Sequence, residues 1–205
     1  YTFHLHTGGI INHITHKSIV IMLILKPKAN KMPKTFLRVA NGNIIAKQGE
    51  EELLFDTVTG MVKHIELRQH TFQKKHFSRW HIQMEDSRTE DVYDLSFGRT
   101  SGVFRTIIRC LASDEGLLRL NDIEIHVYRP SYGNYTNAVV YGHGKKLNWI
   151  PENVPPVLYR QVNGNTIADN SLRDEWLEGL VNRINESAMK TLPLDAPSIK
   201  NVGED

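Results

Sequence analysis

The chain has 205 residues, which is enough for one domain of common size with appendages. Its 40% hydrophobic and 23% charged residues are typical of an ordinary soluble globular protein. The formal net charge of +2 comes from residues 1–31, which hold four lysines and no acid, because the remaining 21 basic and 23 acidic residues give −2. A histone-like coat for duplex DNA is therefore excluded, and any nucleic-acid footprint must be local.

Residues 1–31 differ from the rest of the chain. Their longest apolar run, residues 19–25, is far shorter than the roughly 20 residues that span a bilayer, and no signal-peptide cleavage site follows it. We expect Met32 to be the natural start and residues 1–31 to be a non-native or disordered leader. The segment also holds four histidines, His4, His6, His13 and His16. Because no carboxylate or cysteine accompanies them, we expect no metal site there.

The first patterned elements are β-strands. Asn41-Gly42, a strong hairpin signal, separates apolar runs at 35–39 and 43–47. A long β-like stretch follows at 52–72, where Gly60 indicates a bulge or sharp bend.

Two strands with alternating apolar residues come next, at 80–85 and 92–97, joined by a polar turn at 86–91. The period then changes to that of a helix over 101–112, with Ser101 as its N-cap. One apolar stripe defines this helix, formed by Val103, Phe104, Ile107, Ile108 and Leu111.

Alternation returns at 123–128, and strands at 136–141 and 146–150 are predicted around the tip Gly142-His143-Gly144. After three prolines, a helix is predicted over 171–189, with apolar rows that must cover either the barrel or another subunit. The last residues, 191–205, read as a loose tail.

This order of strands around a single helix is that of the OB-fold, a five-stranded Greek-key barrel. We therefore expect a mainly β protein with an OB-fold-like barrel at 32–155, followed by a C-terminal helix and tail at 156–205. OB-folds bind oligonucleotides through strands 2 and 3 and through two loops, which correspond here to residues 70–79 and 129–135.

The segment 68–80, R-Q-H-T-F-Q-K-K-H-F-S-R-W, suits such a site, because its cations can neutralise phosphates and its rings can stack on bases. The predicted nucleic-acid-binding residues are Arg68, Lys74, Lys75, Phe77, Arg79, Arg129, Tyr132 and Tyr135. The alternative is a solvated basic loop whose aromatics turn into the core. Trp80 is expected in the core because it lies on the same side of its strand as Ile82 and Met84. Phe72 is assigned neither to the core nor to the binding surface.

No enzyme motif is present: there is no P-loop, no dinucleotide-binding glycine motif and no nucleophile elbow. We therefore expect no catalytic residue, no cofactor and no metal. Cys110, the only cysteine, excludes an intrachain disulfide, favours a reducing cytosol and is predicted to be a small core residue.

Four runs, F-D-T-V-T-G-M-V, W-H-I-Q-M-E-D, V-Y-D-L-S-F and S-G-V-F-R-T-I-I-R-C-L-A, resemble single-stranded DNA-binding proteins of Bacteroides-infecting, crAss-like phages and related mobile elements. The resemblance covers about residues 33–150. It implies an OB-fold protein that coats single strands during replication or recombination, in the cytoplasm of a bacterial or phage-infected cell. The end of the chain, 203–205, lacks the aromatic tip with which many such proteins recruit partner enzymes.

The leading hypothesis is thus a non-sequence-specific single-stranded DNA-binding protein without enzymatic activity, with RNA left open as a ligand. The competing hypothesis is a structural or protein-interaction module of a phage or mobile element. A nuclease is the weakest reading. Expected partners are single strands and replication or recombination proteins, with no membrane, and the C-terminal helix offers a route to oligomers.

Overall fold

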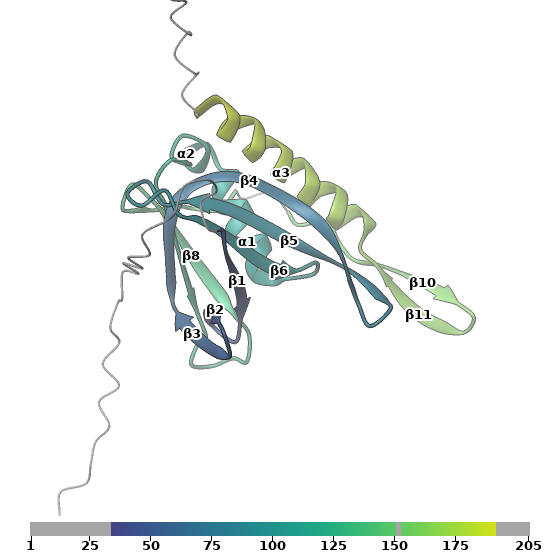
Figure 1. Ribbon diagram of the computed structural model, residues 1–205. Coiled ribbons are helices and arrows are strands. Elements are labelled where there is room, and N and C mark those ends of the chain that lie inside the picture. Colours follow the sequence, from purple (N-terminus) through teal and green to yellow (C-terminus); the bar gives the residue numbers. More distant parts are fainter. Residues whose placement is uncertain (1–33, 151–152, 192–205) are drawn as a thin grey trace, which may run out of the picture.

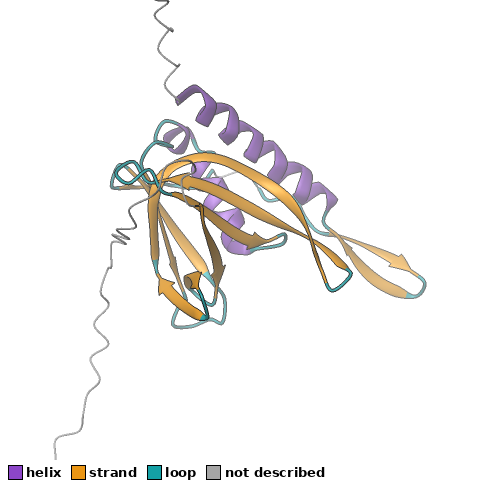
Figure 2. Ribbon diagram, in the orientation of Figure 1, coloured by secondary structure: helices purple, strands orange, loops and turns teal. Residues whose placement is uncertain are grey.

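The computed structural model describes residues 34–150 and 153–191 as a mainly β protein, in which helices lie against a large sheet (Figures 1 and 2). The large sheet contains β1 (Lys34–Ala40), β2 (Asn43–Gln48), β3 (Glu51–Phe55), β4 (Thr57–Phe72), β5 (Lys75–Glu85), β6 (Val92–Gly98), β7 (Ile123–Tyr128), β8 (Asn137–Gly142) and β9 (Lys145–Lys146). A separate hairpin contains β10 (Leu158–Val162) and β11 (Asn165–Asp169). The helices are α1 (Gly102–Leu111), α2 (Asp114–Leu117) and α3 (Ser171–Thr191).

The large sheet is open. Its strand order is β3-β2-β1-β6-β5-β4-β7-β8-β9, and all neighbours are antiparallel except β1 and β6. The described strands do not form a closed barrel, and the sheet contains nine strands where the expected OB-fold-like barrel has five. Closure of the five strands from β6 to β8 would require β8 to pair with the other edge of β6, and the N-terminal hairpin occupies that edge through β1.

The predicted strand 52–72 is two strands, because the chain breaks at Asp56 between β3 and β4. The irregularity in pairing lies between Val62 and His64, not at Gly60 as expected. Gly60 instead ends the segment of β4 that pairs with β7. A Cβ at Gly60 would lie 2.7 Å from the carbonyl oxygen of Glu85, so glycine permits the close approach of β4 and β5 there.

Helix α1 forms as the apolar stripe predicts. Ser101 caps it, since its Oγ accepts a hydrogen bond from the backbone N of Phe104 at 3.3 Å. Phe104 is buried and stacks on Trp80 with ring centroids 5.0 Å apart, which confirms that Trp80 is a core residue. The core therefore lies between α1 and the face of the sheet that carries Trp80.

Helix α3 covers the sheet of its own chain. Its buried residues are Leu177, Leu180, Val181, Ile184 and Ala188. The Asn185 side chain fixes the helix to β4, because it bonds both the backbone N and the carbonyl oxygen of Ile65 at 2.8 Å. The helix was expected to cover either the β-domain of its own chain or another subunit, and the structure shows it against its own chain. Leu172, which lies in the apolar pattern that predicts this helix, is exposed.

Two C-terminal features differ from expectation. The predicted strand 146–150 is reduced to β9, because Ile150 N bonds to the carbonyl oxygen of Arg109 and draws the chain toward α1. The hairpin β10–β11 was not predicted, although its turn carries the Asn163-Gly164 signal and both residues have positive φ. The predicted leader, 1–31, and all but Thr191 of the predicted tail lie outside the described residues.

Candidate nucleic-acid interface

One face of β1, β6, β5 and β4 carries polar, basic and aromatic side chains, and we call it the outer face. Residues alternate along each strand, so every second side chain points away from the core that α1 covers. The registers bring these side chains together from strands far apart in sequence. The outer face contains Lys34, Phe36, Arg38, Glu66, Arg68, His70, Phe77, Arg79, His81, Gln83, Asp94 and Ser96.

Asp94 is the central residue, or ionic hub, of the outer face, because it contacts side chains from three other strands. Its side chain is fully buried, yet it bonds Lys34 Nζ at 2.7 Å, an Arg68 guanidinium nitrogen at 2.6 Å and His81 Nδ1 at 2.7 Å. Burial raises the pKa of Asp94, but the hydrogen bonds from His81, Lys34 and Arg68 lower it by more. The net effect holds the pKa of this carboxyl well below its usual range, so Asp94 is ionised at neutral pH.

Arg68, predicted as a phosphate ligand, has two carboxylate partners. Besides Asp94 it bonds Glu66, with an ion-pair distance of 2.5 Å. The hydrogen bond to Glu66 is the main cause that raises the pKa of Arg68. Glu66 and Arg68 are two residues apart on one strand, so they share a face. Arg68 therefore holds β4 to β6 and contributes little uncompensated charge.

Phe77 lies at the exposed end of a stack of three rings. Its centroid is 5.5 Å from that of His70 with an interplanar angle of 15°, and His70 stacks in turn on His81 at 5.2 Å. Burial is the main cause that lowers the pKa of His70, followed by the nearby charges of His81, Arg79 and Arg68. His70 is therefore neutral at neutral pH. Phe77 is 41% exposed, which leaves its ring accessible beside this stack.

Arg79 is the least compensated arginine of the outer face. It donates from Nε to Ser96 Oγ at 2.6 Å, and within residues 34–150 and 153–191 it forms no ion pair with a carboxylate. Burial and the neighbouring charge of Arg38 lower its pKa. Among the described residues, the one ion pair of Arg38 is with Glu52, at 3.1 Å and with both side chains exposed, a contact that is weak in water.

Phe36 and Arg38 also belong to the outer face, although they are not among the residues predicted from the sequence to bind nucleic acid. Phe36 is 64% exposed, and Lys34 Nζ lies 5.6 Å from its ring centroid. The run K-T-F-L-R could have indicated this position, because alternation along a strand places Lys34, Phe36 and Arg38 on the face away from the buried Leu37.

Lys74 and Lys75 lie at the exposed tip of the β4–β5 hairpin. The segment 70–79, expected to be a loop, is mostly paired strand: Phe72 pairs with Lys75 and only two residues form the turn. Gln73 and Lys74 both have positive φ, as a tight hairpin turn of this type requires. Phe72 is exposed near the tip.

The second predicted loop, which joins β7 to β8, carries Arg129, Tyr132 and Tyr135. Both tyrosines are exposed, with ring centroids 6.5 Å apart, and Arg129 is bonded within the loop to Gly133 and Asn134. The Arg129–Asn134 segment borders a hollow of about 620 Å³.

In an OB-fold-like barrel the two predicted loops are expected to converge, but here this loop lies apart from the β4–β5 tip. It is held beside the β1–β2 turn, where Gly42 N donates to Thr136 Oγ1 at 2.9 Å. Figure 1 shows the β4–β5 tip elsewhere, on the side of the molecule where β10 and β11 project. The strand pairing is the physical reason: β7 runs antiparallel to β4 and ends beside Thr57 at the start of β4, whereas the tip follows Phe72 at the other end of β4.

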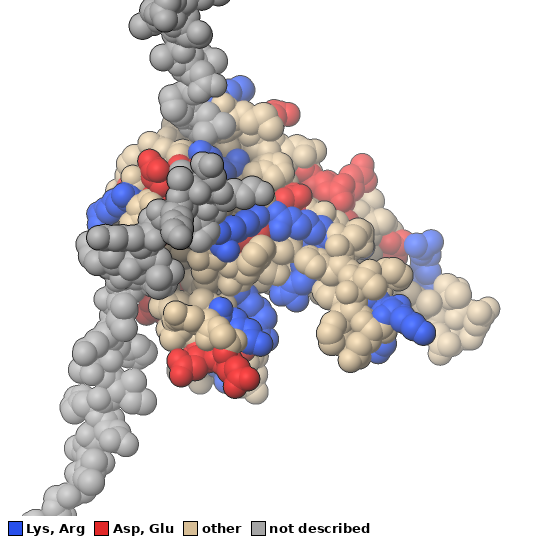
Figure 3. Space-filling view, viewed as in Figure 1, with Lys and Arg blue, Asp and Glu red and all other residues tan. Residues whose placement is uncertain are grey.

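The charges on this side of the molecule are unevenly distributed. Figure 3 shows lysine and arginine atoms gathered over the middle of the view, where Figure 1 places β1, β6 and β5. Acidic atoms gather separately at the β2–β3 turn, which carries Glu50, Glu51 and Glu52. The outer face is thus a local basic footprint on a chain whose net charge is small.

Other chemistry has less support. No group of three or more metal-ligating side chains occurs in the part of the chain that the structure describes. Within the same part, no helix is long and apolar enough to cross a membrane. Burial raises the pKa of the Cys110 thiol to about 11, which suits a core residue and not a nucleophile. Comparison with protein-family models, curated proteins and solved structures finds no match to this chain.

Proposed function

We propose that this protein binds single-stranded nucleic acid, with single-stranded DNA as the first candidate, without sequence specificity and without catalysis. The observation that carries the proposal is the exposed Phe77 ring, stacked on His70 and adjacent to the uncompensated Arg79. Exposed rings bind bases of any identity, and arginines neutralise phosphates, so this combination favours binding that does not depend on sequence.

The strand arrangement supports the same surface. Five neighbouring strands occur in the order β6-β5-β4-β7-β8, which is third, second, first, fourth and fifth along the chain, with α1 between the third and fourth. We interpret them as an opened OB-fold to which the N-terminal hairpin adds strands beside β6. In an OB-fold the second and third strands bind the oligonucleotide, and here those strands are β5 and β6 of the outer face.

The outer face offers a path for a strand between two phenylalanines. Phe36 pairs with Asp94 in the β1–β6 register, and Asp94 pairs with Gln83, six residues from Phe77 along β5. At about 4.8 Å per strand and 3.4 Å per residue, Phe36 and Phe77 lie on the order of 20 Å apart. That separation is compatible with the roughly 4–16 nucleotides that an OB-fold covers. Arg38 and Arg79 lie between the two rings, at positions suited to phosphates.

Titration of a fluorescein-labelled oligo-dT by anisotropy, over a series of salt concentrations, tests the proposal. The matched variants are the triple change Lys74→Ala, Lys75→Ala and Arg79→Ala, and the control Lys190→Ala on the exposed side of α3. Each lost phosphate contact reduces the slope of log K against log salt by about 0.7, so the triple variant should lose up to roughly 2.

Wild type that does not bind at low salt contradicts the proposal. A triple variant with the affinity and slope of wild type contradicts the assigned footprint. Absence of binding would favour the competing function, a protein-interaction module, for which the exposed apolar side chains Phe36 and Leu54 would supply the contact.

A further inference from the structure

The hairpin β10–β11, which we call the arm, projects from the body of the protein (Figure 1). All five residues of β10 are exposed. The two strands of the arm pair with each other and with no other strand among the described residues. A lone two-stranded hairpin is marginal in water, and stable sheets need at least three strands with an apolar face. The arm nevertheless exposes four large apolar side chains, Leu158, Tyr159, Val162 and Ile167. It has the properties of a surface that a partner covers.

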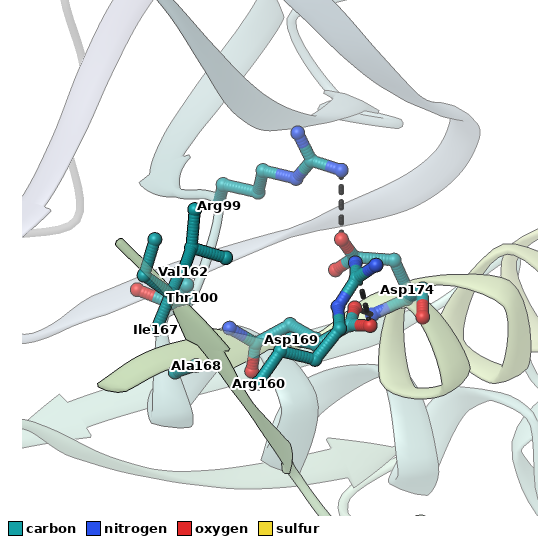
Figure 4. A pocket seen from close by; sticks show the side chains of 10 residues that line it. Arg99, Thr100, Arg160, Val162, Ile167, Ala168, Asp169 and Asp174 are labelled. Atoms are coloured by element: carbon teal, nitrogen blue, oxygen red, sulfur yellow. Dashed lines mark hydrogen bonds and ion pairs between the residues drawn. The ribbon is translucent and has the colours of Figure 1, made fainter. Parts of the chain in front are cut away.

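The register sorts these side chains by face. Arg160 pairs with Ile167, and Leu158 pairs with Asp169, so Leu158, Val162 and Ile167 share one face with the ion pair Arg160–Asp169. Figure 4 shows Val162 and Ile167 beside Thr100 at a hollow of about 590 Å³ between the arm and the body.

The charges at this hollow are compensated, which argues against a nucleic-acid ligand. Arg160 pairs with Asp169 at 2.8 Å, and Arg99 pairs with Asp174 at 2.7 Å (Figure 4). The arm itself, residues 158–169, contains one arginine and one aspartate and is formally neutral. A formally neutral arm with exposed apolar side chains suits a second copy of itself, whereas a nucleic acid needs uncompensated cations.

The charge pattern also distinguishes the two free edges. If two copies of β10 paired antiparallel along their full length, Arg160 would lie directly opposite Arg160 of the other copy, and like charges so placed are destabilising. If two copies of β11 paired in the same way, Ile167 would lie on the two-fold axis. Asp169 would then face Asn165, and Thr166 would face Ala168.

We propose that the protein forms a two-fold dimer in which the β11 edges of two arms pair antiparallel around Ile167. The result is a four-stranded sheet that brings two sets of Leu158, Val162 and Ile167 onto one face. Such a sheet exceeds the three strands that a stable sheet needs, whereas a lone arm has only two. The helix α3 is not needed for this contact, since its apolar face is already buried in the monomer. The dimer is independent of the proposed function, because it uses no residue of the outer face.

Cysteine cross-linking tests the register. Residues facing each other across an antiparallel pair have Cα atoms about 4.5–5.5 Å apart, within the reach of a disulfide. The variant Ile167→Cys should therefore form a covalent dimer under mild oxidation, which a reductant reverses. The control is Gln161→Cys on β10, which would lie three strand spacings, about 14 Å, from its equivalent. The native Cys110 is buried, so wild type should remain uncross-linked.

Light scattering over a concentration series provides the second measurement. Wild type should shift from monomer to dimer with increasing concentration, and Ile167→Lys should remain monomeric because it places two ammonium groups at the axis. Circular dichroism checks that this variant is folded. A wild-type protein that stays monomeric throughout overturns the dimer. Failure of Ile167→Cys to cross-link, or equal cross-linking of Gln161→Cys, overturns the register.

Discussion

Replacement of Asp94 by Asn removes the negative charge that holds Lys34, Arg68 and His81 together on the outer face, and it keeps the shape of the side chain. Loss of one partner from a buried ion pair typically costs about 3–5 kcal/mol. Here the Lys34 and Arg68 side chains are 32% and 25% exposed and keep part of their hydration. We therefore expect the free energy of unfolding of Asp94→Asn to fall by about 2–3 kcal/mol, measured by urea denaturation at pH 7.

The pH dependence of this difference has a defined sign. The pKa of Asp94 is lower in the folded protein than its unfolded value of about 3.9, so its stabilising contribution is complete above that value and is lost as pH falls through the folded pKa. The stability difference between wild type and Asp94→Asn should be constant from neutral pH to about pH 5 and shrink below about pH 4. A loss under about 0.5 kcal/mol at pH 7, or a difference that does not shrink in acid, would mean that the charge of Asp94 does not stabilise the folded protein.

Four further outcomes are expected. Trp80→Ala should lower the free energy of unfolding by about 3–5 kcal/mol, seen as a lower melting temperature, because the indole is buried against Phe104; an unchanged melting temperature would contradict its core position. Phe77→Ala and Phe36→Ala should each weaken oligo-dT binding by about 1–3 kcal/mol with an unchanged salt slope, and a changed slope would mean that they do not act by stacking. The double change Tyr132→Ala and Tyr135→Ala should weaken binding of long oligonucleotides more than short ones, because this loop lies apart from the β4–β5 tip; equal losses would argue against that path. Cys110 should resist a thiol reagent at pH 8 in the folded protein and react after unfolding, since burial raises the pKa of its thiol to about 11.

The local elements were predictable because their signals are local. Strand parity placed Trp80, Ile82 and Met84 in the core, and the change to a helical period located α1 and its Ser101 cap. The turn at Asn41-Gly42 was equally clear, since both residues adopt positive φ.

The sheet closure and the ionic hub were not predictable in the same way. Whether the barrel closes depends on which strand takes the free edge of β6, and β1 reaches it from more than fifty residues earlier in the chain. Asp94 resembles a solvated strand residue in the run V-Y-D-L-S-F. It becomes a buried hub only because Lys34 and Arg68 arrive from two other strands. The same contacts neutralise Arg68, which the sequence alone presents as a free cation.

In the proposed function, Arg38 and Arg79 of the outer face contact the phosphates of a single strand. The most direct test is the salt dependence of oligo-dT binding for the double variant Arg38→Ala and Arg79→Ala, beside wild type and the Lys190→Ala control. We predict that the slope of log K against log salt falls by about 1.4 in the double variant and is unchanged in the control. A double variant with the wild-type slope and affinity would mean that Arg38 and Arg79 do not contact the phosphates.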